Sequence, residues 1–359
     1  MATNHDTVDS LRRDRKDSCE TELPVRPEVA IPSEYETPMT RAESPAASMA
    51  LSPSGSQGLS LAALYETTKP RITRLVTITS ALGFGLGALT YRPATLDLVT
   101  GFIAAIMGSG LAAAGANTLN QWMERSRDAR MPRTRTRPLP TGRATPTTVL
   151  FFGVELCVLG VAVAWALAGL PAAVLISATV LSYLLLYTPS KPGLWSSTWI
   201  GAVPGAFPPV IGWACAGGSW SSLAEIGPWA LFTIMFVWQI PHFLAIAWMY
   251  KDDYAAGGYS VLPVVDRSGR WTWTMMVLWA AILLPVTMLP PLVMDATPGF
   301  IAVPVGAIAG VWFLSQTVRV ARSRTRADAR KVLIGSVIYL PILMAAWVAD
   351  AGLGMALGW

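Results

Sequence analysis

The amino-acid sequence predicts an all-α membrane protein with about nine transmembrane helices. Of its 359 residues, 53% are hydrophobic and only 14% are Asp, Glu, Lys or Arg, and the mean hydropathy is +0.45. Water-soluble domains usually carry about a quarter charged residues, so this composition excludes an ordinary soluble enzyme. The apolar residues also fall into separate stretches, each long enough to cross a bilayer as a helix of about 20 residues.

Residues 1–58 form a polar segment that differs from the rest of the chain. They are rich in Ser, Pro, Thr and Glu and contain no apolar run, and such a composition cannot bury enough surface to offset the entropy of ordering. We therefore expect a disordered N-terminal tail, followed by a membrane domain over residues 59–359. The tail is too acidic for a mitochondrial presequence and lacks the apolar core of a signal peptide, so a bacterial inner membrane is expected.

Nine apolar stretches follow the tail, and each has the length of one membrane crossing. The expected spans are 72–91, 96–118, 147–168, 171–187, 199–217, 227–249, 272–292, 299–318 and 332–350. Little more than Ala168, Gly169 and Leu170 separates the third span from the fourth, which predicts a tight antiparallel hairpin. No connection between spans is long enough for a separate soluble domain.

The basic residues of the membrane domain predict its orientation. Twenty Lys or Arg residues lie before the first span or after an even-numbered span, whereas Arg92 alone lies on the other side. Because cytoplasmic loops carry the excess of Lys and Arg, we expect the N-terminus in the cytoplasm and the C-terminus outside. The basic excess is therefore mostly a topology signal, and nucleic acid is not an expected partner.

Few acids remain in the membrane domain, and two short clusters of them indicate its chemistry. Asn120, Glu124 and Asp128 recur at intervals of four residues, so a helix places all three on one face. Asp252 and Asp253 follow the sixth span and reach the same side of the membrane. Their oxygens suit Mg²⁺, which is commonly shared with substrate phosphates. The alternative is that the acids only pair with neighbouring arginines on a solvated helix end.

Basic side chains on the same side would supply countercharge for a phosphate group. Arg133, Arg137 and Lys191 all follow even-numbered spans, and Arg and Lys are the usual partners of phosphate oxygens. Metal-binding acids beside a lipid-lined cavity fit the departure of diphosphate from an allylic lipid. The metal stabilises the leaving group, and a dry cavity keeps water from the cation.

These same segments resemble known motifs. Residues 120–140, NQWMERSRDARMPRTRTRPLP, resemble the first motif of the protohaem IX farnesyltransferases (haem O synthases), a family in the UbiA superfamily of intramembrane prenyltransferases. Residues 238–243, WQIPHF, with 253–263, DYAAGGYSVLP, resemble the second motif. Smaller matches are Lys69-Pro70-Arg71, Tyr187-Thr188-Pro189 and the segments 201–209 and 336–341. The likeness covers about residues 60–355 and leaves out the tail.

The resemblance implies a bundle of nine helices around a central cavity open to lipid. The implied activity is transfer of a farnesyl group from farnesyl diphosphate to a vinyl group of haem b, assisted by Mg²⁺. Water then adds to give the side chain of haem O, and diphosphate leaves. Haem b is thus a substrate rather than a cofactor. A haem A synthase, which uses haem O, is an implied partner.

The resemblance also implies roles for individual residues. The catalytic residues would be Asn120, Glu124, Asp128 and Asp253, which together with Asp252 would hold Mg²⁺ and the diphosphate. The residues implied in substrate binding are Lys69, Arg71, Arg133, Arg137, Tyr187, Lys191, His242 and Tyr254. His242 is the one histidine of the membrane domain, and a contact with haem iron suits its chemistry. A hydrogen bond in the core is the alternative for a lone histidine on an apolar span.

Other classes of protein fit only parts of the pattern. A UbiA-type enzyme that prenylates an aromatic quinone precursor or a tetrapyrrole pigment is one alternative, but ring-prenylating relatives usually carry Asp at the position of Glu124. A transporter would often show an internal repeat and charges near the bilayer midplane, and we find neither in the sequence. A haem carrier has no use for two acid clusters. Asp350 matches no motif and is expected to be a packing or helix-end acid.

Overall fold

The computed structural model describes residues 60–294 and 298–357, and all regular secondary structure in this part of the chain is helical. Nine helical segments there are long and apolar enough to cross a membrane, which confirms the predicted all-α fold. The spans are Pro70–Tyr91, Thr95–Asp128, Pro146–Ala168, Leu170–Ser190, Ser197–Gly217, Ile226–Met249, Arg270–Val293, Ala302–Ser323 and Arg326–Leu357. The predicted tail, 1–58, lies outside the described residues.

Four of the spans consist of more than one helix. The second contains α3 (Thr95–Ile103), the π-helix η2 (Ala104–Gly108) and α4 (Ser109–Asp128), and the fourth contains α6 (Leu170–Leu181), the π-helix η3 (Ser182–Tyr187) and α7 (Thr188–Ser190). The fifth contains α8 (Ser197–Ala206) and α9 (Pro208–Gly217), and the seventh α13 (Arg270–Val286) and α14 (Leu289–Val293). The other five are α2 (Pro70–Tyr91), α5 (Pro146–Ala168), α10 (Ile226–Met249), α15 (Ala302–Ser323) and α16 (Arg326–Leu357).

Short helices lie before the first span and between later spans. They are α1 (Leu61–Thr67), the 3₁₀ turn η4 (Ser221–Leu223), α11 (Lys251–Ala256) and α12 (Leu262–Val265). The predicted hairpin between the third and fourth spans is confirmed, because α5 and α6 are joined by Gly169 alone. Gly169 has a φ of 85°, a conformation that glycine adopts without steric cost, and Pro171 then lies in the first turn of α6.

The fifth span is broken where two prolines follow Phe207. Pro208 and Pro209 have no N–H to donate to the preceding turn, so α8 ends at Ala206 and α9 begins at Pro208. The break lets α9 pack closely against α2. A side chain at Gly212 would collide with the carbonyl oxygen of Ser80, and one at Gly83 would collide with the backbone of Pro209. Small residues at this contact are typical of helices that approach closely in membranes.

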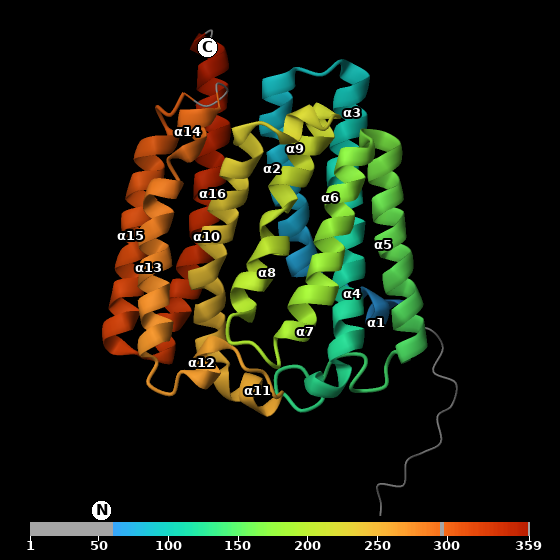
Figure 1. The fold of residues 1–359 in the computed structure, drawn as a ribbon, viewed down its shortest axis with the longest axis vertical. Helices are drawn as coiled ribbons and strands as arrows, with labels where there is room; N and C mark the ends of the chain where they lie inside the picture. Colours follow the sequence, from blue (N-terminus) through green and yellow to red (C-terminus); the bar gives the residue numbers. More distant parts are fainter. Residues whose placement is uncertain (1–59, 295–297, 358–359) are drawn as a thin grey trace, which may run out of the picture. The chain divides into compact units, whose positions relative to one another are not determined.

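The fifth and sixth spans form the interior of the bundle. In each of them 67% of the residues in the apolar stretch are buried inside the protein. In no other span does this share exceed 44%. In Figure 1, α8 and α10 lie between a group containing α13, α15 and α16 and a group containing α4, α5 and α6. At the end opposite α11, Asp350 of α16 is fully buried. It accepts hydrogen bonds from the N–H groups of Gly299 (2.5 Å) and Ile301 (2.7 Å), so the expected packing role is confirmed.

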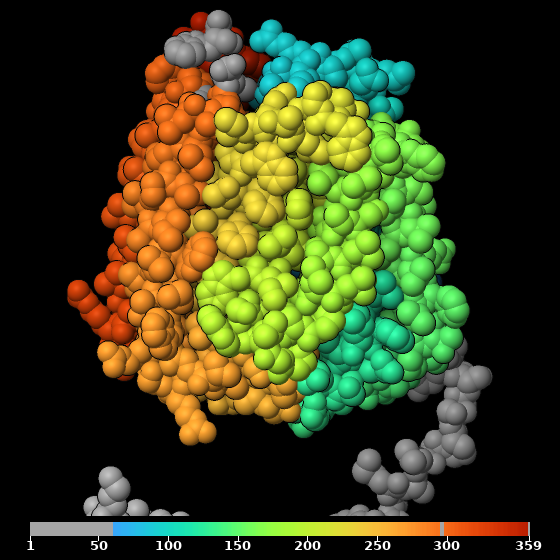
Figure 2. Space-filling model, in the orientation of Figure 1, coloured from blue at the N-terminus to red at the C-terminus, as the bar shows by residue number. Residues whose placement is uncertain are grey.

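Several connections gather at one end of the bundle. Figure 1 shows α1, α11, α12 and the loop between α4 and α5 together at the lower end, where α4, α7 and α10 finish. On the face drawn in Figure 2, residues around 250–270 form the lower edge beside the residues around 130. Residues that are far apart in the sequence therefore meet at this end, and all the acids singled out from the sequence lie here except Asp350.

Candidate active site

Asn120, Glu124 and Asp128 share the buried face of α4, as their spacing predicts. Asn120 and Asp128 are each 1% exposed and Glu124 is 7% exposed, while Ser126, on the opposite face of the helix, is exposed. This burial contradicts the alternative of a solvated helix end. Buried polar side chains require partners, because an unpaired charge in a medium of low polarity is costly.

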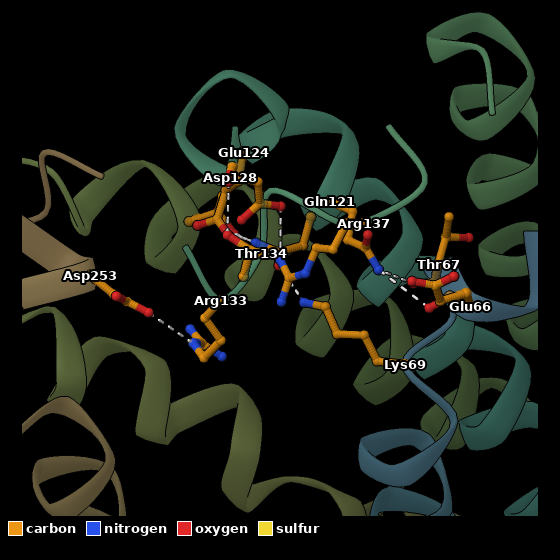
Figure 3. A network of polar contacts seen from close by, with 12 residues as sticks. Glu66, Thr67, Lys69, Gln121, Glu124, Asp128, Arg133, Thr134, Arg137 and Asp253 are labelled. Atoms are coloured by element: carbon orange, nitrogen blue, oxygen red, sulfur yellow. Dashed lines mark hydrogen bonds and ion pairs between the residues drawn. The ribbon is translucent and has the colours of Figure 1, made fainter. Parts of the chain in front are cut away.

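The partners are cations from other parts of the chain. The pairs are Lys69 with Asn120 (Nζ–Oδ1 2.7 Å), Lys191 with Glu124 (Nζ–Oε1 2.7 Å), Arg137 with Asp128 (N–Oδ2 2.8 Å) and Arg133 with Asp253 (Nε–Oδ2 3.9 Å). Figure 3 shows that the Arg137 and Arg133 side chains come from the loop after α4, whereas Asp253 comes from α11. The two predicted acid clusters are thus linked through arginines of one loop.

The loop between α4 and α5 folds back against the end of α4. The Thr134 hydroxyl donates to the Asp128 carbonyl oxygen at 2.9 Å, within the network in Figure 3. Arg127 and Arg130 donate to the Gly257 carbonyl oxygen at 3.1 and 3.0 Å. These bonds tie the segment that follows α11 to the end of α4, which explains how Asp253 comes close to residues more than a hundred positions earlier.

The π-helix η3 brings Tyr187 and Thr188 against α4 and α8. The Thr188 hydroxyl lies 3.1 Å from Asn120 Nδ2, and the ring centroid of Tyr187 lies 4.4 Å from Lys191 Nζ. A Cβ at Gly201 of α8 would come within 2.5 Å of the Tyr187 ring, so only glycine leaves room for this ring. π turns occur often at functional sites, and here the turn aims two side chains at the acid face.

The two lysines have pKa values shifted in opposite directions. Burial, together with the nearby Arg137 guanidinium, lowers the pKa of Lys69 to about 7. Burial also acts to lower the pKa of Lys191, but Tyr187 and the Glu124 carboxylate outweigh it and hold the pKa well above its usual value. The surroundings of Lys191 therefore favour its charged form, whereas those of Lys69 disfavour it.

Some residues predicted for the site lie at its edge or away from it. Arg71 and Asp252 are exposed, and no ion pair or hydrogen bond joins either to the described acids. Tyr254 lies beside the Arg133 guanidinium, 5.9 Å from the ring centroid. His242 lies elsewhere on α10, where its Nδ1 is 2.7 Å from Ser336 Oγ and its ring stacks on Trp238.

The direction of the His242 hydrogen bond is fixed by its partner. The Ser336 hydroxyl donates to the Leu333 carbonyl oxygen at 2.7 Å, and it has no second hydrogen to give. His242 Nδ1 therefore carries the proton and donates to Ser336. This leaves the lone pair on Nε2, the atom of a neutral imidazole that binds metals when Nδ1 donates elsewhere. The ring is half-buried.

Two residues of the site were not assigned roles from the sequence. Thr188 contacts Asn120 directly, and Tyr259, 4% exposed, has Lys191 Nζ 5.9 Å from its ring centroid. Both lie inside motif matches, at Tyr187-Thr188-Pro189 and in 253–263, so the resemblance marked their neighbourhood. Hydroxyl groups recur throughout the chain, and only the packing of α4, η3 and α11 indicates which of them face the acids.

The acid face fits a divalent cation that is shared with a ligand. No group of three His, Cys, Asp or Glu side chains lies close enough to hold a metal alone within residues 60–294 and 298–357. Mg²⁺ usually takes one or two carboxylates and completes its shell with water and phosphate oxygens. Asp128 Oδ1 is buried and has no hydrogen-bond partner in the described part of the chain, so it has lone pairs to offer. Asn120, Glu124 and Asp128 could therefore contribute to such a site.

Comparison with known proteins places this geometry in a family. A model of the UbiA prenyltransferase family matches residues 76–340. The chain belongs to the UbiA prenyltransferase family. This range includes α4, η3, α10 and α11, which carry most of the candidate site. As a family member, the chain is a membrane prenyltransferase, and this agrees with its nine apolar spans.

Three curated relatives of the chain carry the same name. The chain is 43% identical over 291 residues to the protoheme IX farnesyltransferase of Solibacter usitatus, covering 79% of this chain and 97% of the relative. It is 39% identical to the enzyme of the same name from Opitutus terrae, covering 79% and 93%, and 41% identical to that from Salinibacter ruber, covering 79% and 96%. The identity extends over nearly the whole length of each relative.

Solved structures of more distant relatives share the fold. A digeranylgeranylglyceryl phosphate synthase aligns with a TM-score of 0.63 at 15% identity, covering 81% of this chain and 98% of that one. A UbiA homologue from Archaeoglobus fulgidus, bound to GPP and Mg²⁺, aligns with a TM-score of 0.57 at 16% identity, covering 80% and 99%. These likenesses confirm the predicted UbiA-like helical bundle.

Proposed function

We propose that this chain transfers the farnesyl group of farnesyl diphosphate to a vinyl group of haem b and so makes haem O. The observation that carries the proposal is the identity of 43% over 97% of a relative named protoheme IX farnesyltransferase. The buried, cation-paired acid face of α4 supports it, because prenyl transfer requires a site that accepts a diphosphate leaving group. The product would be used by a haem A synthase.

In this proposal the acid face binds the diphosphate through Mg²⁺. Asn120, Glu124, Asp128 and Asp253 would hold the metal, with Asp252 at the edge. The metal, when bound, stabilises the charge that develops on the leaving diphosphate. A homologue structure that contains both GPP and Mg²⁺ supports this pairing of ligands in the fold.

Cations in and beside the acid face would bind the phosphate oxygens once the substrate enters. The residues proposed to contact the diphosphate or a haem propionate are Lys69, Arg71, Arg133, Arg137 and Lys191. Arg and Lys suit this role because they donate strong charge-assisted hydrogen bonds to phosphate and carboxylate. The present pairing of Lys191, Arg137 and Arg133 with Glu124, Asp128 and Asp253 offsets the charge of these carboxylates before the substrate enters.

The reaction balances without any further reactant except water. The bond between C1 of the farnesyl group and the diphosphate oxygen breaks, and a carbon–carbon bond forms to the terminal vinyl carbon of haem b. Water adds to the adjacent carbon and loses a proton, which gives the hydroxyl group of haem O. Apolar helices around the site keep water from the farnesyl cation until the new bond has formed. We assign Tyr187, His242 and Tyr254 to the walls of the substrate site.

The proposed orientation places this chemistry on the cytoplasmic side of a bacterial inner membrane. Twenty basic residues lie on the side of the site and one on the other, and the positive-inside rule then puts the site in the cytoplasm. Labelling of Cys variants from each side of the membrane tests this orientation. Labelling of the α4–α5 loop from outside the cell would contradict it.

The deciding experiment is an assay of membranes that contain the chain. Given haem b, farnesyl diphosphate and Mg²⁺, they should accumulate haem O and diphosphate, measured by chromatography of extracted haems. Membranes that carry the Asp128→Ala variant provide the control. If the chain instead prenylates an aromatic quinone precursor or a tetrapyrrole pigment and leaves haem b unchanged, the proposal is wrong.

A further inference from the structure

The Thr188 hydroxyl in the candidate active site determines which way the Asn120 side-chain amide is oriented. Thr188 is 5% exposed, and its Oγ1 donates to the Tyr183 carbonyl oxygen at 2.9 Å. That bond uses the one hydrogen of the hydroxyl. Asn120 Nδ2 lies 3.1 Å from the same Oγ1, so Asn120 is the donor and Thr188 the acceptor.

The other end of the amide agrees with this assignment. Since Thr188 takes the amide nitrogen, the second terminal atom of Asn120 is its oxygen. Lys69 Nζ donates to this oxygen at 2.7 Å. Since Asn120 is 1% exposed, its amide is held at both ends inside the protein, with the nitrogen on Thr188 and the oxygen on Lys69.

The two contacts differ in what happens to them when a diphosphate enters. Lys69 has a long, flexible side chain, and in the proposed function it turns to the phosphate oxygens. Thr188 is neutral, and both its hydroxyl and its backbone N–H donate to the carbonyl oxygen of Tyr183, near the start of η3. Thr188 therefore stays in place when Lys69 moves.

We propose that Thr188 is a positioning residue that keeps the Asn120 carbonyl oxygen turned toward the metal and diphosphate. The proposal rests on the proposed function, since it concerns the same site. Without the Thr188 acceptor, the buried Asn120 nitrogen would lose its partner. Once Lys69 has moved, the amide could then rotate and present its N–H₂ group to a cation, where an oxygen is needed.

The test compares three variants of the full chain in detergent micelles. Thr188→Val keeps the shape of the side chain but removes the acceptor, and Thr188→Ser keeps the hydroxyl. Thr179→Val is the matched control, because Thr179 is half-buried and its hydroxyl donates to the Leu175 carbonyl oxygen of its own helix, away from the site. Binding of Mn²⁺ in the presence of farnesyl thiodiphosphate is measured by electron paramagnetic resonance, alongside kcat and KM.

We expect Thr188→Val to weaken Mn²⁺ binding about tenfold, the equivalent of about 1.4 kcal/mol, which is typical for loss of one buried hydrogen bond. Thr188→Ser should recover most of this loss, and Thr179→Val should bind as the unmodified chain does. In an Asn120→Ala background, Thr188→Val should have no further effect, because no amide remains to be positioned. A purely structural role would instead give additive losses.

The outcomes separate this inference from the proposed function. The positioning role is wrong if Thr188→Val binds Mn²⁺ as tightly as the unmodified chain does. It is also wrong if Thr188→Val weakens Mn²⁺ binding as much in the Asn120→Ala background as it does alone. If the unmodified chain still makes haem O in that case, the proposed function stands. If the unmodified chain binds no Mn²⁺ with farnesyl thiodiphosphate, the metal assignment on which both proposals rest is wrong.

Discussion

Two ion pairs of equal length allow a direct test of what burial does to the candidate site. Lys191 and Glu124 are separated by 2.7 Å, with side chains 12% and 9% exposed, and Arg143 and Glu66 are also separated by 2.7 Å, with side chains 44% and 45% exposed. Removing one partner of a buried pair costs about 3–5 kcal/mol, because it leaves an uncompensated charge. An exposed pair contributes about 0.2–1 kcal/mol.

We therefore expect Lys191→Met to lower the free energy of unfolding by about 3 kcal/mol, at the lower end of the range for buried pairs. The reason for the lower end is that Lys69 also acts on the Glu124 carboxylate. Arg143→Met, the matched control, should cost less than about 1 kcal/mol. Both values are measured by unfolding in mixed micelles with increasing SDS, followed by tryptophan fluorescence.

The double variant Glu124→Gln/Lys191→Met separates stability from activity. It leaves no buried charge unpaired, so it should regain most of the stability that Lys191→Met loses. It should remain inactive, because both the carboxylate and the cation of the proposed site are gone. Equal losses of stability in Lys191→Met and Arg143→Met would refute the reasoning from burial. Full haem O formation by the double variant would refute the role of the pair.

Three further predictions concern other residues. Asp128→Ala or Asp253→Ala should abolish haem O formation while the protein still inserts in the membrane, and undiminished turnover in either variant would exclude the metal assignment. Ser336→Ala removes the group that fixes the His242 ring, so the Soret spectrum of bound haem should shift if His242 contacts the iron; an unchanged spectrum contradicts that contact. Asp350→Ala should lower the thermal unfolding midpoint, since each lost hydrogen bond to a charged group costs about 1.5–3 kcal/mol, and an unchanged midpoint would contradict its anchoring role.

The spans were predictable because the bilayer imposes their length and polarity. The nine predicted stretches correspond to nine observed spans, and the hairpin at Gly169 follows from the few residues between two of them. The ends were less predictable. The second span continues to Asp128 and the ninth begins at Arg326, because these helices extend beyond the apolar stretch, where hydropathy no longer signals them.

The acid face was predictable for a similar reason. Asn120, Glu124 and Asp128 lie one helical turn apart, and the helical period alone places them together. The low content of charged residues made these few acids conspicuous. The sequence could not indicate which cation pairs with which acid, because Lys69, Arg137 and Lys191 come from three different connections.

The sequence by itself determined the number of spans, their alternation and the common face of the three α4 side chains, since these properties depend on residues close together in the chain. Only the tertiary structure decided that Lys191 lies on Glu124, that Thr188 accepts from Asn120, and that His242 is held by Ser336 of the last span. Each of these contacts joins residues 67 or more positions apart. Such contacts depend on how whole helices pack, which no local pattern of residues specifies.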